Sequence, residues 1–255
     1  MDRLRDASAR RRPIDDIRSS GQAGHRTVMR IAVLVSGRGS NMLRLADHLM
    51  KDQAAVRRPD CEIGLVAANK ACAGLDLADQ RGLATSLVDR SDFETRAAQE
   101  TVLAKQIEDA GVDWICLAGY MAVLSASFVA RFAGRIINIH PSLLPAHKGL
   151  DTHKRVLEAG DTMHGATVHL VTPALDDGPI ILQAGLAVES SDNPDSLAAR
   201  VLTLEHVLYP FVIESLANGA VRIENGRVGW PDQPAALANT TLPVEDVLGP
   251  HLIWP

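Results

Sequence analysis

Asn138 and His140 stand two positions apart at the end of the apolar run RIINIH (135–140), and Pro141 follows them. Alternate residues of a β-strand point to the same face, so a strand here would present the amide and the imidazole side by side. Both groups can donate hydrogen bonds to a developing oxyanion, and a histidine can also move a proton. The pair predicts a site for attack on a carbonyl group, with simple packing of the histidine as the alternative.

Two aspartates, Asp176 and Asp177, lie in the turn LDDGP (175–179) after a second strand-like run. A carboxylate close to a histidine favours the protonated form of the imidazole. We therefore expect an aspartate from this turn to lie beside His140. The same composition is common in turns that have no chemical role, which is the competing interpretation.

A glycine-rich turn, SGRGSN (36–41), follows the first apolar run and opens a helical pattern. Glycines let a backbone approach an anion, and the free N–H groups of a helix start supply donors. A dinucleotide fingerprint would need a third glycine where Met42 stands, and the Lys-Ser/Thr pair of a P-loop is missing. Gly39, Ser40 and Asn41 are candidates for a cradle that holds one phosphate, with helix capping as the alternative.

Five of the nine histidines fall between positions 140 and 169, namely His140, His147, His153, His164 and His169. A metal site is one interpretation, but the spacing matches neither H-E-x-x-H nor another ligand motif, so we expect no metal. Nucleophilic hydrolase chemistry based on a serine is also disfavoured, because the G-x-S-x-G motif is missing and Ser142 lies between two prolines.

The elements that must position these residues alternate in type from Met29 onward. Short apolar runs at 30–36, 62–69, 84–89, 113–120 and 135–140 predict buried strands, with helical patterns at about 41–55, 72–82 and 92–110 and a further helix before the last run. Continuous apolar strands separated by helices predict an α/β fold with a doubly wound, mostly parallel sheet.

After Gly165 the pattern changes. The strand-like runs 166–172 and 180–188 are joined by a turn too short for a helical crossover, so the sheet should continue into an antiparallel portion. A helix over about 195–217 follows, and Asn225-Gly226 predicts a small hairpin. We expect one domain over 29–230, an irregular tail over 231–255 and an N-terminal extension over 1–28.

Composition narrows the partners and the compartment. With 255 residues and a net charge of −5, the chain has no positive field to gather nucleic acid. The longest apolar runs are shorter than the roughly 20 residues of a membrane span. Three cysteines, an odd number, favour reduced thiols in the cytoplasm. The first 28 residues carry seven arginines but lack the apolar core of a secretory signal. A small-molecule substrate is expected, with the chain a monomer or a homodimer.

Six segments in this order carry a resemblance to a known family: VLVSGRGSN (33–41), CLAGYM (116–121), IINIHPSLLP (136–145), KGLDTH (148–153), HGATVHLVTPALDDGPIILQ (164–183) and RVLTLEHVLYP (200–210). Together they resemble the phosphoribosylglycinamide formyltransferases, folate-dependent enzymes of purine biosynthesis. The resemblance runs from about Met29 to Gly229. It implies a formyltransferase fold and direct transfer of a formyl group from the co-substrate 10-formyltetrahydrofolate to glycinamide ribonucleotide.

The resemblance also implies roles for individual positions. The catalytic group would be Asn138, His140 and Asp176, and the substrate phosphate would lie on Gly39, Ser40 and Asn41. Glu205 would contact the glycinamide end, and the folate contacts would be Arg96, Met121, Ala122, Val123, Leu124 and Asn138. Asp151 stands where some members have histidine, and Ala122 where a relative has arginine, so side-chain roles there are unsupported. The sequence leaves open whether the Leu144–Pro145 peptide bond is cis.

Other interpretations remain. A methionyl-tRNA formyltransferase would need a further domain and positive charge. A formyltetrahydrofolate hydrolase would carry an N-terminal regulatory domain and would have no use for the phosphate cradle. A non-catalytic nucleotide-binding module could keep the cradle, but it would not need Asn138, His140 and Asp176 together.

Overall fold

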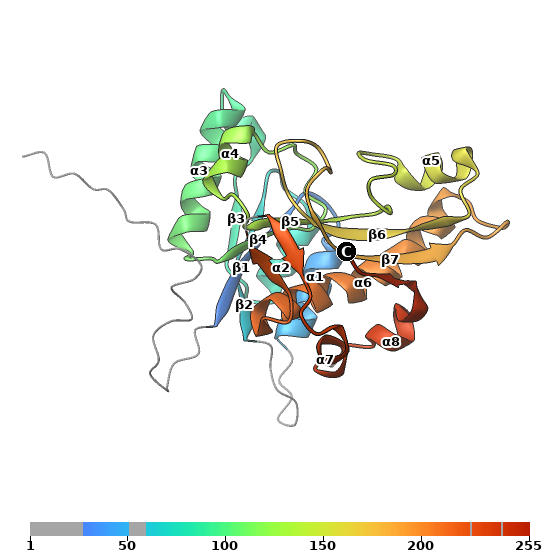
Figure 1. The fold of residues 1–255 in the computed structure, drawn as a ribbon. Coiled ribbons are helices and arrows are strands. Elements are labelled where there is room, and N and C mark those ends of the chain that lie inside the picture. The colour runs from blue at the N-terminus through green and yellow to red at the C-terminus, as the bar shows by residue number, and fades with distance from the viewer. Residues whose placement is uncertain (1–27, 51–59, 225, 241) are drawn as a thin grey trace, which may run out of the picture.

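The computed structural model describes residues 28–50, 60–224, 226–240 and 242–255, which form an eight-stranded sheet with helices on both faces (Figure 1). Residues 1–27 lie outside this part, so the predicted extension is not described. The strand order is β10-β7-β6-β5-β4-β1-β2-β3. The predicted fold class, a mostly parallel sheet that continues into an antiparallel portion, is confirmed.

The first half alternates strands and helices. Its elements are β1 (Met29–Val35), α1 (Ser40–Leu49), β2 (Cys61–Ala68), α2 (Ala73–Gln80), β3 (Thr85–Leu87), a 3-10 turn (Arg90–Asp92), α3 (Arg96–Asp109), β4 (Trp114–Leu117), α4 (Ala126–Arg131) and β5 (Ile136–His140). The strands pair in parallel in the order β3-β2-β1-β4-β5. Helix α3 starts later than expected, because the Thr95 side chain caps it by accepting from Ala98 N at 3.1 Å.

The second half adds antiparallel strands. Its elements are α5 (Thr152–Ala159), β6 (Met163–Leu170), β7 (Ile180–Ala187), α6 (Pro194–Asn218), β8 (Arg222–Glu224), β9 (Arg227–Gly229), α7 (Gln233–Ala238), α8 (Val244–Val247), a 3-10 turn (Gly249–His251) and β10 (Leu252–Ile253). As predicted, β6 and β7 pair antiparallel, and β8 and β9 form a small hairpin.

The expectation of an irregular tail over 231–255 is wrong in one respect. This segment contains α7 and α8, and β10 adds an antiparallel strand to the edge of the sheet beside β7. Trp254 stacks edge to face on Trp230 with ring centroids 4.8 Å apart. Elements this short show no clear periodicity in the sequence, and contacts with β7, α6 and Trp230 hold them in place.

The core lies on both faces of the sheet, because the strand side chains alternate between two apolar layers. Ile31, Val33 and Val35 of β1 pack in the layer that includes α1 and α6, whereas Ala32 and Leu34 pack in the layer that includes α3 and α4. All three cysteines are free thiols. Burial raises the pKa of the Cys116 thiol to about 12.

Helix α6 is long and apolar enough by length and composition to cross a membrane. In the described part of the chain it is a core helix, since it packs against α1, α5, β6 and β7 and 61% of its most apolar window is buried. Its Tyr209 hydroxyl donates to the carbonyl of Leu117 at 3.1 Å, which ties α6 to β4. This contact lies beneath the strand ends that carry the candidate site.

Candidate active site

Strand register brings the expected residues to one edge of the sheet. Leu34 of β1 pairs with Leu117 of β4, and Leu117 pairs with Asn138 of β5. Neighbouring strands lie about 4.8 Å apart, so Asn138 is roughly 10 Å across the sheet from the end of β1. His140 lies two residues further along the same strand and is 5% exposed. The amide and the imidazole therefore emerge where the glycine-rich turn also begins.

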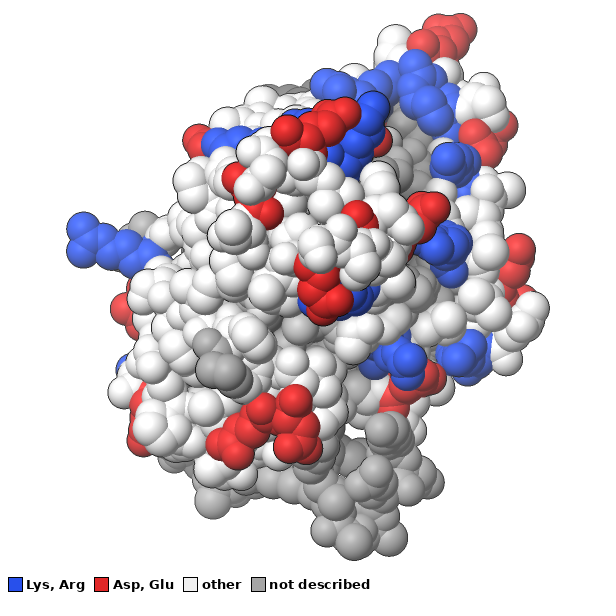
Figure 2. All heavy atoms as spheres, turned by 90° about the vertical axis from the view of Figure 1, so that its right-hand side faces the viewer, with Lys and Arg blue, Asp and Glu red and all other residues white. Residues whose placement is uncertain are grey.

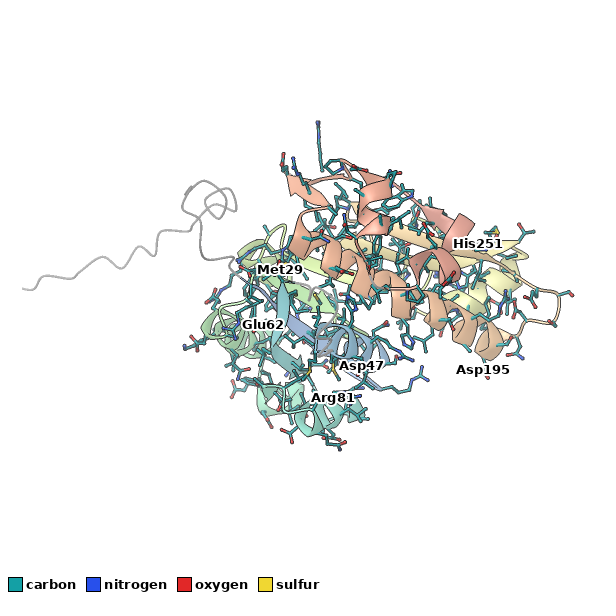
Figure 3. All side chains as sticks on the ribbon, turned by 90° about the horizontal axis from the view of Figure 1, so that it is seen from below. Met29, Asp47, Glu62, Arg81, Asp195 and His251 are labelled. Carbon is teal, nitrogen blue, oxygen red and sulfur yellow. The ribbon has the colours of Figure 1, made fainter. Side chains whose placement is uncertain are left out.

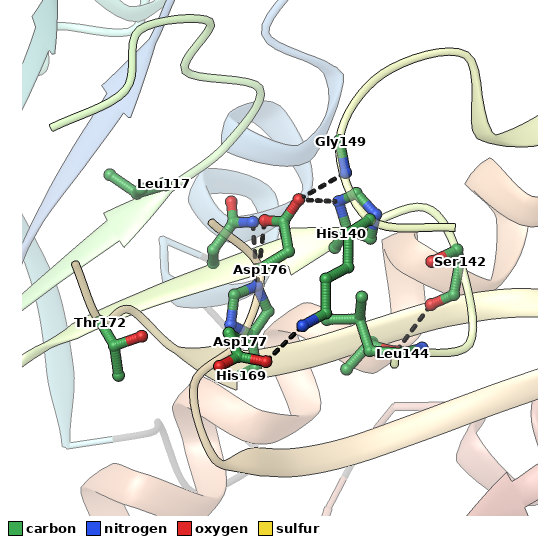
Figure 4. Close-up of polar contacts among 12 residues, drawn as sticks. Leu117, His140, Ser142, Leu144, Gly149, His169, Thr172, Asp176 and Asp177 are labelled. Carbon is green, nitrogen blue, oxygen red and sulfur yellow. Dashed lines mark hydrogen bonds and ion pairs between the residues drawn. The ribbon is translucent and has the colours of Figure 1, made fainter. Parts of the chain in front are cut away.

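Asp176 meets His140 from the loop between β6 and β7 (Figure 4). Its Oδ2 lies 3.5 Å from His140 Nδ1, and the same oxygen accepts a hydrogen bond from Gly149 N at 2.8 Å. Asp176 has a φ of +47°, a left-handed conformation that is uncommon for a residue other than glycine. The adjacent Asp177 is exposed and pairs with Lys148 instead, which lowers the pKa of the Asp177 carboxyl.

His169 connects Asn138 to this group, and sequence analysis considered it only as a metal ligand. It lies opposite Asn138 in the pairing of β5 with β6, and Asn138 Nδ2 donates to His169 Nε2 at 3.2 Å. His169 Nδ1 donates to the carbonyl of Leu170 at 2.8 Å. Burial lowers the pKa of His169, which favours the neutral ring with a lone pair on Nε2. One Asn138 N–H is therefore held by His169, and the other remains available.

The loop after β5 holds the Nε2 edge of the His140 ring, opposite the Nδ1 edge that faces Asp176. His140 Nε2 donates to the carbonyl of His147 at 3.1 Å, and Gly149 of the same loop holds Asp176. The loop includes a cis peptide bond between Leu144 and Pro145. With Nε2 bound to the backbone, the Nδ1 edge that faces Asp176 is the edge that can meet a substrate.

The glycine-rich turn opens α1 as expected. Gly39 occupies the N-cap position with φ +73°, and it makes no side-chain capping bond because it has no side chain. Helix α1 then starts at Ser40, so capping by Ser40 or Asn41, the alternative interpretation of this turn, does not occur. The first N–H groups of α1 remain available to an anion.

Asn41 and Glu205, expected to contact different parts of a substrate, touch each other. Asn41 Nδ2 donates to Glu205 Oε2 at 2.6 Å, which joins α1 to α6 across the core. Burial raises the pKa of Glu205 to about 7, and the bond from Asn41 opposes this shift. Asn41 Oδ1 is buried without a hydrogen-bond partner among the described residues.

The expected folate residues gather at the start of α3 and after β4. Arg96 Nη1 donates to the carbonyl of Val123 at 3.3 Å. Met121 N donates to Ser36 Oγ at 2.8 Å, which links this segment to the end of β1. The side chains of Met121 and Val123 are 68% and 59% exposed, so they offer an apolar surface beside the polar group. Leu124 is buried beneath them and supports the segment from below.

The side chains of the other three histidines between positions 140 and 169 pair with neighbours other than Asn138, His140 and Asp176. His153 Nδ1 lies 3.0 Å from His164 Nε2, and His147 Nε2 lies 2.6 Å from Asp161 Oδ2. The pKa of His164 falls to about 4, chiefly through burial. Within the described residues, no group of three or more His, Cys, Asp or Glu side chains has the arrangement of a metal site.

Charge is mixed on the face seen in Figure 2. Lysine and arginine side chains are interspersed there with aspartate and glutamate rather than gathered into one broad basic area. Among the described residues drawn on this face, neither sign of charge forms a single continuous patch.

The fold and the polar group at its sheet edge define a class of one-carbon transferases. Residues 29–213 match the formyl transferase family, so the chain belongs to this family. A phosphoribosylglycinamide formyltransferase from Escherichia coli is 44% identical over 207 residues, which covers 80% of this chain and 94% of that protein. The family expected from the sequence motifs is confirmed.

Two further relatives extend the comparison. A trifunctional purine biosynthetic protein from Bos taurus is 42% identical over 203 residues, although the chain spans only 20% of that protein's length. The structure of a phosphoribosylglycinamide formyltransferase from Coxiella burnetii has a TM-score of 0.74 at 40% identity and covers 79% of this chain and 93% of its own. The match extends over nearly the whole of the E. coli and C. burnetii proteins.

Proposed function

We infer that this chain transfers the formyl group of 10-formyltetrahydrofolate to the amine of glycinamide ribonucleotide, a step of de novo purine biosynthesis. The similarity to the E. coli enzyme over 94% of that enzyme's length supports this function. One structural observation supports it: Asn138, His140 and Asp176 lie at the same sheet edge as the turn before α1, a helix start without a side-chain cap. An amine that bears a phosphate at its far end fits such a site.

In the proposed complex, the substrate phosphate lies on the N–H groups of Gly39, Ser40 and Asn41. Glu205, which is buried beside Asn41, receives the glycinamide end. A carboxylate with a pKa near 7 can accept a hydrogen bond or a proton from that end at neutral pH. The cradle and Glu205 then hold the amine in one orientation toward Asn138 and His140.

The formylfolate lies in this proposal against the segment Met121, Ala122, Val123 and Leu124. Exposed apolar side chains and backbone groups offer the mixture of contacts that a flat heterocycle needs. Ala122 can contribute only through its backbone. Arg96, held to the Val123 carbonyl, supplies positive charge for a carboxylate of the folate.

The chemical step is direct transfer. The amine nitrogen attacks the formyl carbon, a carbon–nitrogen bond forms, and the carbonyl electron pair moves to oxygen. Asn138 Nδ2–H and His140 Nδ1–H donate to that oxygen, and Asp176 favours the protonated imidazole. The intermediate collapses when the bond from carbon to the folate nitrogen breaks. That nitrogen takes a proton, which Asp176 helps to route from the amine through water. No covalent enzyme intermediate or metal is needed.

The decisive assay measures folate absorbance in the presence and in the absence of glycinamide ribonucleotide. We expect turnover only when the acceptor is present. Turnover that ignores the acceptor would indicate a formyltetrahydrofolate hydrolase. Absence of any turnover would overturn the proposal, and formylation of initiator methionyl-tRNA in its place would reassign the acceptor.

A further inference from the structure

Helices α1 and α2 touch through two glycines at their first turns. A Cβ added to Gly39 would lie 2.5 Å from Gly74 Cα, and a Cβ added to Gly74 would lie 2.9 Å from Gly39 Cα. Gly74 N donates to the carbonyl of Gly37 at 2.8 Å. At their other ends, Arg81 Nη2 lies 3.5 Å from Asp47 Oδ1 (Figure 3). The helix pair is therefore tied at both ends.

The conformation of Gly74 does not itself require glycine. Gly74 is the second residue of α2, and its φ lies outside the positive range. Alanine would be about 1 kcal/mol better than glycine inside a helix. Backbone atoms of the glycine-rich turn are what exclude a larger residue here, since a Cβ would also meet Gly37 O at 3.0 Å and Gly39 N at 3.2 Å.

The bond from Gly74 also orients a peptide group in the turn. It satisfies one of the N–H groups that a helix start leaves unpaired. The Gly37 carbonyl consequently points toward α2. Because the peptide is planar and trans, the N–H of Arg38 in the same peptide group points the opposite way. The Gly37 carbonyl would repel an anion. The bond to Gly74 N turns this carbonyl away from the side of the turn toward which the Arg38 N–H points.

We propose that Gly74 is a positioning residue for the phosphate cradle. It holds Gly37 and Gly39 in the conformation that presents N–H groups to the anion. A dinucleotide-type fingerprint has a third glycine at the position of Met42. In this chain, the glycine that allows close packing against the turn is Gly74, which comes from α2. This inference rests on the proposed function, because it takes the ligand of the cradle to be the phosphate of the substrate.

The test is Gly74→Ala, with Gly64→Ala as the matched control. A Cβ on Gly64 would meet side-chain atoms rather than backbone, at 3.2 Å from Arg30 Nε and 3.3 Å from Val112 Cγ1, and it lies on β2, away from the cradle. For Gly74→Ala we expect the KM for glycinamide ribonucleotide and the inhibition constant of inorganic phosphate to rise together, by about tenfold. The KM for formylfolate and kcat should stay within about twofold, as should every constant of Gly64→Ala.

Two results would overturn the inference. One is an unchanged KM for glycinamide ribonucleotide in a folded Gly74→Ala variant. The other is an equal loss in both KM values and kcat together with a lowered melting temperature, which would indicate a general structural role. An inactive wild-type protein would instead refute the proposed function, so the two failures are distinguishable.

A measurement on the unaltered protein covers the case in which the variant does not fold. Saturating inorganic phosphate should slow hydrogen exchange of the Gly74 amide at least threefold, because an occupied cradle stabilises the bond to Gly37 O. Phosphate that shifts the NMR signals of the Ser40 and Asn41 amides without slowing Gly74 would overturn the role of Gly74.

Discussion

At the scale of single residues, the neighbouring carboxylates of Asp176 and Asp177 differ in the groups that they contact, although they are chemically identical. Asp176 faces His140 and is held by Gly149, whereas Asp177 pairs with Lys148 at the surface. Sequence composition alone makes the two aspartates equivalent. Their contacts place them in different environments, so we expect substitution of Asp176 to lower kcat far more than substitution of Asp177.

We predict that Asp176→Asn lowers kcat about 100-fold, the range of a lost proton-transfer or electrostatic partner. An asparagine can still accept from Gly149 N, so the loop should keep its shape while the charge is lost. The matched control, Asp177→Asn, should lower kcat less than threefold. Steady-state kinetics on both variants provides the measurement. Similar losses in the two variants would contradict the role of Asp176.

The raised pKa of Glu205 leads us to predict that the stability of the folded protein depends on pH. Its folded pKa is raised to about 7, above its ordinary 4.5, so the folded protein holds a proton that the unfolded chain releases between these values. This contribution is present below about pH 4.5 and is lost as the pH rises through 7, a decrease on the order of 3 kcal/mol in the free energy of unfolding.

Glu205→Gln should remove this contribution, because glutamine does not titrate and can still accept from Asn41. Urea unfolding of both proteins between pH 5 and 8 measures the difference. We expect the variant to gain stability relative to the wild-type protein as the pH rises. Parallel pH profiles would show that Glu205 ionises normally in the folded chain.

At the scale of elements, strand ends and short loops make the candidate site. β5 supplies Asn138 and His140, β6 supplies His169, and the following loop supplies Asp176. Parallel strands place their carboxyl ends at one edge, which is why β1 and β5 deliver their polar groups together. The antiparallel pairing of β6 with β5 then brings His169 opposite Asn138, where it can hold the amide.

The C-terminal elements stabilise the edge of the sheet formed by β10 and β7, which lies opposite the β3 edge. Trp230 stacks on Phe211 and donates from Nε1 to the carbonyl of Ile181 at 2.9 Å, and Trp254 packs on Trp230. We predict that Trp254→Ala lowers the free energy of unfolding by about 2 kcal/mol through lost aromatic contact and burial.

The control for this prediction is Ile253→Ala, because Ile253 is the last residue of β10, directly precedes Trp254 and is 42% exposed. It should cost less than about 1 kcal/mol. Neither substitution should change kcat more than twofold, since neither side chain belongs to the polar group. Chemical denaturation followed by circular dichroism gives both values. Equal destabilisation by the two substitutions would show that the aromatic contact contributes nothing beyond pairing of β10 with β7.

At the scale of the whole molecule, the described fold begins at β1 with Met29, whose backbone N donates to the carbonyl of Asp60 at 2.7 Å. Every candidate site residue lies between 39 and 205. We predict that a chain starting at Met29 retains kcat/KM within about twofold and the same melting temperature. Activity assays and thermal unfolding of the shortened and full-length chains test this. A tenfold loss of activity would assign a role to residues 1–28.

Much of the fold and of the candidate site could be predicted from the sequence, because the patterns that indicate them are local. Continuous apolar strands between helical patterns predict the parallel sheet, and the spacing of Asn138 and His140 predicts a shared face. The motif order identifies the family, and a glycine-rich turn before a helix indicates an anion site. Apart from the order of the motifs, each of these depends on residues close together in the chain, whose geometry follows from backbone periodicity.

Contacts between distant segments were decided only by the tertiary structure. The register of β5 against β6 determines that His169 lies opposite Asn138. The contacts of Asp176 with His140 and of Asp177 with Lys148 separate two aspartates that only the family resemblance had distinguished, and helix packing brings Gly74 against Gly39. The order of the tail depends on the edge that β7 offers to β10 and on the packing of α8 against α6. The physical reason is that side-chain chemistry and backbone periodicity are local properties, whereas register, loop closure and close backbone approach depend on the packing of the whole sheet.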